Sequence, residues 1–228
     1  MIGNFFRVAW LVMRKDMTVE VRSREVLFTT LFFAVSVVLV FSFAIVREGR
    51  APDDVAAGIL WVAISFAGTL AMGRTFERER YNDTLRALIL APADRPAVYL
   101  GKLWGLLLLL GLVEIVLVPL VGLLFNAPIL SYPVQLASLL VFGTIGFSAV
   151  GTLFAAMLVR VRSRDTLLPV LLYPITIPVM IAGVRGTAAL FQAAPDEPMA
   201  RFWIGLLLTW DAIFLTLALW TFEPVMTE

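Results

Sequence analysis

The sequence predicts an all-α integral membrane protein with six transmembrane helices, an N-terminal amphipathic interfacial helix and a cytoplasmic coupling helix. Hydrophobic residues make up 61% of the 228 residues, whereas a soluble domain contains about 45–50% apolar residues. Six apolar runs approach or exceed the ~20 residues that cross a bilayer, and basic residues gather on alternate connectors. Because the connectors are short, we expect a single transmembrane domain over residues 1–228.

Residues 1–25 predict an amphipathic elbow helix that lies flat in the membrane interface. Apolar side chains from Ile2 to Met17 fall on one helical face, and Trp10 suits the level of the lipid headgroups. The charged stretch 21–25 then leads into the first span. A short solvated helix is the alternative. Arginine and lysine residues interrupt this region, so we expect no cleaved secretory signal.

The apolar runs predict spans at residues 26–46, 55–73, 98–125, 133–159, 166–184 and 202–222. The third and fourth exceed the hydrocarbon thickness and require tilt or extension beyond it. The fourth contains Gly143, Gly146 and Gly151, and such small residues let helices approach closely. We expect them to pack within the chain, although a subunit interface would have the same pattern.

The fifth span predicts an irregular helix. It contains Pro169, Pro174 and Pro178, and each proline removes a backbone donor and obstructs the regular helix. We therefore expect a kinked or broken helix there. The connector that follows, residues 185–198, carries an apolar patch at 188–191. This patch either dips into the outer leaflet or belongs to an ordinary surface loop.

The distribution of basic residues predicts the orientation. Those near the span ends divide 14 to 4 between the two sides of the membrane. The richer side comprises the N-terminal segment, the loop 74–97 with the neighbouring Lys102, and the loop 160–165. Basic residues stay preferentially in the cytoplasm, so both termini are expected to be cytoplasmic.

The cytoplasmic loop 74–97 predicts a coupling helix that docks on a partner. Tyr81, Leu85, Leu88 and Ile89 follow the i, i+4, i+7, i+8 spacing of one helical stripe, and Pro92 ends the helix. The residues predicted to dock and couple are Phe76, Glu77, Glu79, Arg80, Asp83, Leu85, Arg86, Leu88 and Pro92. A solvated charged face is the alternative.

A second cytoplasmic contact is predicted in the connector that follows span four. It comprises Arg160, Arg162, Arg164 and Asp165. These charges also serve as a topology signal, and this simpler interpretation remains open.

The sequence lacks the residues of several kinds of active site, so we predict no enzyme and no catalytic residue. It has no cysteine and no histidine, which argues against a disulfide framework or a zinc site of these ligands. Gly101-Lys102 is followed by Leu103 where a phosphate loop needs Ser or Thr. A net charge of +1 predicts no nucleic-acid partner. Energy for transport is therefore expected from a partner or an ion gradient.

Two acidic residues lie within predicted spans, Glu114 in the third and Asp211 in the sixth. A charged acid at mid-membrane costs about 2.5–3.5 kcal/mol on insertion scales, so each is expected to face the bundle interior, paired or protonated. Both are candidates for a proton or substrate role. A packing hydrogen bond is the simpler interpretation.

Three separated stretches resemble one known family. The first runs from Phe76 through Pro92 to Lys102 and reads FERERYNDTLRALILAPADRPAVYLGK; the second covers residues 15–25; the third is RDTLLPVLLYPITIP, from Arg164 to Pro178. In this order, and with six spans, they are similar to CcmB, the membrane subunit of the haem-exporter ABC complex of cytochrome c maturation. Glu79 to Leu85 departs from the acidic-x-x-Asp-Gly-Ser-Leu pattern of some members.

The resemblance implies a permease of the ABC exporter class in the bacterial cytoplasmic membrane. It implies an ATPase subunit of the CcmA type that binds the ATP, a second copy of this chain, and CcmC-like and CcmD-like neighbours, all surrounded by membrane lipid. Haem is implied as cargo, or as the load of a chaperone whose release the complex drives. No cofactor held by this chain is implied.

Three other functions remain open. The first is an exporter-class ABC permease for a lipid, a polysaccharide or a drug. The second is a secondary transporter coupled to protons through Glu114 or Asp211, although no inverted repeat of the kind common in such folds is visible. The third is a membrane scaffold through which nothing passes.

Overall fold

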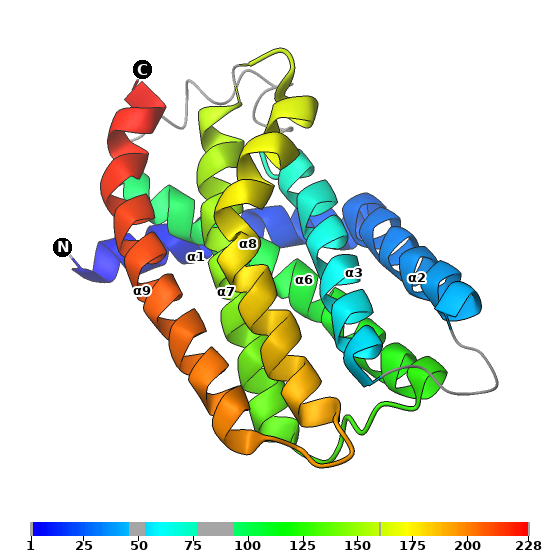
Figure 1. Cartoon of the computed structure of the whole chain (residues 1–228). Helices are drawn as coiled ribbons and strands as arrows, with labels where there is room; N and C mark the ends of the chain where they lie inside the picture. Colours follow the sequence, from blue (N-terminus) through cyan, green and yellow to red (C-terminus); the bar gives the residue numbers. More distant parts are fainter. Residues whose placement is uncertain (1, 46–52, 77–93, 160, 228) are drawn as a thin grey trace.

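The predicted all-α fold with six long apolar helices is confirmed by a computed structural model that describes residues 2–45, 53–76, 94–159 and 161–227 (Figure 1). Its helices are α1 (Ile2–Ser23), α2 (Glu25–Ile45), α3 (Asp53–Arg74), α6 (Arg95–Phe125), α7 (Pro133–Met157), α8 (Arg164–Phe191) and α9 (Glu197–Thr227). Six of them, all but α1, are long and apolar enough to cross a membrane. The described residues include no strand. The chain is a multi-pass membrane protein.

Local sequence signals set several helix ends. Prolines in the first turns of α6 and α7 cost no helical hydrogen bond there. Asn126 ends α6 in the left-handed region, with φ of 54°, and its N–H donates to the Gly122 carbonyl. Arg24, at φ 53°, turns the chain between α1 and α2. Glu20 Oε1 accepts a hydrogen bond of 2.9 Å from the Leu27 N–H, which satisfies a free donor of α2.

Helix α7 is the centre of the bundle. It packs against α3, α6, α8 and α9, and 78% of its most apolar 18-residue stretch is buried, against 17% for α2 and α9. The C-terminal ends of α3, α7 and α9 and the N-terminal end of α8 lie together at the upper end in Figure 1. Helix α6, the long third span, crosses behind α7 and α8 at an incline.

Glycines of α7 provide space for large side chains of its neighbours. A Cβ atom added at Gly143 would lie 2.1 Å from the Trp61 ring, and one at Gly151 would lie 2.0 Å from the Met72 sulfur. Trp61 and Met72 both belong to α3. The expectation of packing within the chain is confirmed at both positions. We expected these glycines to let helix backbones approach closely. Instead, Gly143 and Gly151 make room for the Trp61 and Met72 side chains.

Helix α8 is continuous through all three prolines, so the expectation of a broken helix is wrong, whereas the alternative of a kinked helix stays a prediction. The Pro174 and Pro178 side chains are exposed on the outer face of α8, whereas Leu172, Thr176 and Val179 are buried. The helix also continues to Phe191, so the apolar patch 188–191 is its buried last turn and no part of a loop. The connector to α9 is only residues 192–196.

Candidate functional site

The predicted coupling helix lies outside the described residues. This applies to Glu77, Glu79, Arg80, Asp83, Leu85, Arg86, Leu88 and Pro92, and also to Arg160. Its docking role stays a prediction. The structure does describe both ends of the loop: Phe76 follows α3, and Asp94 precedes α6.

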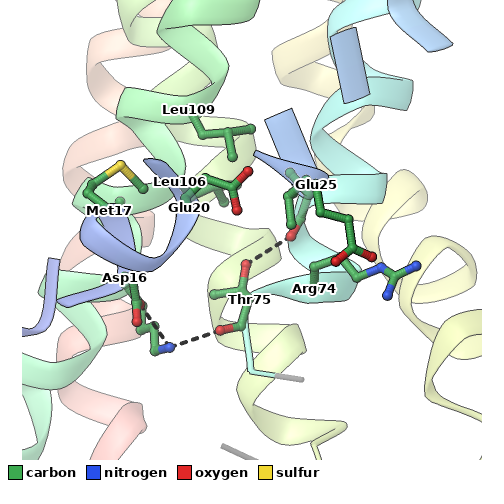
Figure 2. A pocket seen from close by; sticks show the side chains of 12 residues that line it. Asp16, Met17, Glu20, Glu25, Arg74, Thr75, Leu106 and Leu109 are labelled. Carbon is green, nitrogen blue, oxygen red and sulfur yellow. Dashed lines mark hydrogen bonds and ion pairs between the residues drawn. The ribbon is translucent and has the colours of Figure 1, made fainter. Parts of the chain in front are cut away.

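A buried lysine joins three elements where this loop begins. The Lys102 ammonium lies 2.9 Å from Asp16 Oδ2 and donates a 2.9 Å hydrogen bond to the Thr75 carbonyl (Figure 2). It also lies 5.1 Å from the centre of the Phe76 ring, within the range of a cation–π contact. The Phe76 side chain is fully buried. We name Asp16, Thr75, Phe76 and Lys102 the Lys102 cluster.

A cavity of about 110 Å³ adjoins the Lys102 cluster between α1, α2, α3 and α6. The acidic residues Asp16, Glu20 and Glu25 and the basic residue Arg74 line it, and Leu106 and Leu109 provide part of its apolar wall (Figure 2). Among the described residues, no group of three or more His, Cys, Asp or Glu side chains is arranged to hold a metal ion. Because charged and apolar side chains both line the cavity, it is amphipathic.

The second predicted contact divides into exposed and buried parts. Arg162 and Asp165 are exposed in the α7–α8 connector and in the first turn of α8, whereas Arg164 is buried. Of the three side chains of this contact that the structure describes, Arg162 and Asp165 are accessible to a partner.

The two acids within the spans are buried on different faces of α7. Glu114 of α6 accepts a short hydrogen bond from the Thr144 hydroxyl. Asp211 of α9 lies against Gly146, where an added Cβ would be 2.6 Å from Oδ1. Neither Asp211 oxygen has a hydrogen-bond partner among the described residues. Thr144 and Gly146 are two residues apart, about 200° around a helix, so α7 separates the two carboxylates.

Sequence reasoning missed the pairing of Asp16 with Lys102. The sequence predicts Lys102 as part of the topology signal and of the family-like stretch, and it places Asp16 off the apolar face of the first helix. Among the side chains of α1 that the structure describes, residues 5–23, Ala9, Met13 and Glu20 are buried and Asp16 is half-buried between them. Their spacing of i, i+4, i+7 and i+11 is that of one helical face. This spacing was the available signal that Asp16 lies on the packed face of α1, but it does not identify Lys102 as the partner.

Comparison with known proteins identifies the family. A family profile described as "CcmB protein" matches residues 7–225. The chain belongs to the CcmB family. Among its curated relatives, Heme exporter protein B of Pseudomonas aeruginosa is 30% identical over 176 residues, which cover 77% of this chain and 78% of that protein.

Two further relatives of this CcmB-family chain carry the same name. Heme exporter protein B of Escherichia coli K12 is 30% identical over 191 residues, 83% of this chain and 84% of that protein. Heme exporter protein B of Rhodobacter capsulatus is 28% identical over 193 residues, 83% of this chain and 88% of that protein. The similarity therefore includes most of the transmembrane domain, and it confirms the resemblance drawn from the three sequence stretches.

Proposed function

We propose that this chain is the membrane permease subunit of an ABC transporter that exports haem, or releases a haem-loaded chaperone, in cytochrome c maturation. The observation that carries the proposal is membership of the CcmB family over nearly the whole chain, with relatives named Heme exporter protein B. The six apolar helices support the role of a permease. The complex would lie in the bacterial cytoplasmic membrane.

A separate ATPase subunit of the CcmA type supplies the energy in this proposal. The nearest sequence to a phosphate loop, Gly101-Lys102, lies inside α6, and its lysine is buried in an ion pair. A phosphate loop needs exposed backbone N–H groups and a lysine free to reach phosphates. The placement of Gly101-Lys102 therefore supports a motor on another chain.

The ATPase docks on segment 77–93 in this proposal, at the cytoplasmic end of the bundle. That end carries the exposed Arg162 and Asp165, which provide a second charged contact. Phe76 is buried in the Lys102 cluster, so its part in coupling passes through contacts within the chain. A second copy of this chain and CcmC-like and CcmD-like subunits complete the complex.

The docked segment connects the end of α3 to the start of α6. Its ATP-driven movement is therefore transmitted to both helices. Helix α7, which holds α3 side chains in its glycine positions, then repacks with the proline-containing α8. This mechanism does not require haem to pass through the chain. Since the sequence has no histidine and no cysteine, a haem ligand from this chain would be methionine, tyrosine or a carboxylate.

The test is affinity purification of the chain from its membrane, with identification of partner subunits and of bound porphyrin. We expect an ABC ATPase to co-purify with the wild-type chain. It should be lost from a variant that combines the charge reversals Arg80→Glu, Asp83→Arg and Arg86→Glu. Arg185→Glu is the matched control, because Arg185 is an exposed arginine near the opposite end of α8.

Three results would redirect the proposal. Charge reversals that leave the ATPase bound and stimulated would exclude docking at segment 77–93. An ATPase complex with a lipid or polysaccharide and no porphyrin would favour another cargo. Transport that continues with an inactive ATPase would favour a proton-coupled transporter.

A further inference from the structure

The Lys102 cluster holds three separate elements at one point. Asp16 comes from α1, Thr75 and Phe76 follow the last helical residue of α3, and Lys102 lies in α6. The Lys102 side chain is 1% exposed. Its ammonium is therefore largely buried, and Asp16 and Thr75 are two of its polar partners.

The interaction with Thr75 stabilises the end of α3. The last carbonyls of a helix have no N–H partner within it, and they form the negative end of the helix dipole. The Lys102 ammonium donates to the Thr75 carbonyl at this end. The same ammonium forms an ion pair with Asp16, and because Lys102 is buried, removal of Asp16 would leave an uncompensated charge.

The contact with α1 is fixed by a close helix crossing. A Cβ atom added at Gly101 would lie 2.5 Å from the Ala9 carbonyl oxygen and 2.7 Å from Val12 Cβ. Only glycine therefore permits α1 to cross α6 at this distance. Asp16 lies two helical turns after Ala9, on the same face of α1, and this crossing directs it toward Lys102.

We propose that Lys102 is a positioning residue that transmits movement of the ATPase-docking segment to the interfacial helix α1. The inference rests on the proposed function, since it assumes that the ATPase acts on the segment that follows Phe76. A displacement at Phe76 reaches α1 through one buried side chain. The Asp16 end of α1 then moves with the end of α3, and the membrane-surface helix becomes part of the coupling mechanism.

The test uses the absence of cysteine from the chain. A single reporter, Val19→Cys, lies on an exposed position of α1 and is labelled with a maleimide in the purified complex, with and without ATP. We expect ATP to change its labelling rate in the parent complex by at least about fivefold, the lower limit of typical coupling between sites. We expect Lys102→Met to remove this change while the ATPase still co-purifies.

Two matched variants separate coupling from folding. Lys15→Met removes the exposed partner of the same aspartate, since Lys15 Nζ lies 3.0 Å from Asp16 Oδ1; it should retain the ATP-dependent change. Asp16→Asn leaves the Lys102 hydrogen bond to Thr75 in place and weakens the link to α1, so it should reduce the change. If Lys102→Met does not accumulate in the membrane, Asp16→Asn decides the question.

The outcomes distinguish the two proposals. If the parent chain binds no ATPase, the proposed function fails. If the ATPase binds and ATP changes the labelling equally in the parent, Lys102→Met and Asp16→Asn complexes, the role of Lys102 is wrong and the proposed function stands. Absence of any ATP-dependent change in a parent complex that hydrolyses ATP would also overturn the role of α1.

Discussion

The indole of Trp61 occupies space that glycines leave open on two neighbouring helices. Added Cβ atoms would lie 2.1 Å from its ring at Gly143 of α7 and 2.4 Å from it at Gly183 of α8. Its Nε1–H donates a 2.9 Å hydrogen bond to Thr187 Oγ1 of α8. One side chain thus joins α3, α7 and α8, and its buried donor is satisfied, which avoids the cost of an unpaired N–H.

Gly143→Ala should destabilise the protein by about 1–3 kcal/mol, because a methyl group at Gly143 overlaps a rigid ring in a packed interior. The measurement is the heat-induced loss of monodisperse protein in detergent. Gly111→Ala is the control, since nothing lies within 4 Å of a Cβ added at Gly111. We expect that control to be neutral or to gain up to about 1 kcal/mol from helix propensity. Equal melting temperatures for the two variants would contradict the packing described for Trp61.

Helix α8 shows that a proline-rich span need not break. Its three prolines are tolerated without interruption of the helix, and the buried face is formed by other residues such as Leu172, Thr176 and Val179. The bundle around that face stabilises the helical path. Tertiary packing commonly outweighs local propensity in this way.

Pro174→Ala should stabilise the folded chain by up to about 3 kcal/mol, the cost of proline in a helix interior. Pro174 is exposed on α8, so the substitution opens no cavity and restores one backbone donor. Pro133→Ala is the control, because Pro133 lies in the first turn of α7, where proline is favourable. The same thermal assay distinguishes them. A loss of stability in Pro174→Ala would indicate that the proline ring itself makes a required contact.

The elements were predictable to different extents. Length and apolar composition were enough to place six spans, since both follow directly from the bilayer thickness. The end of α8 was misplaced because Arg185 suggested a boundary, although the helix continues to Phe191. The partners of Gly143 and Lys102 were not predictable, because the period of a helix shows which residues share a face and does not show which helix covers it. The crossing of α1 at Gly101 decides the pairing of Asp16.

The whole molecule has two unlike ends, and their charges predict its orientation. The α7–α8 connector lies at the same end of the bundle as the C-terminal end of α9 (Figure 1), and it carries Arg162 among its exposed residues. The α6–α7 connector, residues 126–132, lies at the opposite end and has no basic residue. Basic connectors remain in the cytoplasm, so the α7–α8 connector should be cytoplasmic.

Single-cysteine labelling tests this orientation, because the chain has no cysteine of its own. Ser131→Cys and Ser163→Cys place matched thiols at exposed serines of the two connectors. In cells with a permeabilised outer membrane, an impermeant maleimide should label Ser131→Cys and spare Ser163→Cys. Disruption of the inner membrane should then expose Ser163→Cys. The reverse order would place both the connector and the Lys102 cluster on the periplasmic side, where no ATPase could act on them.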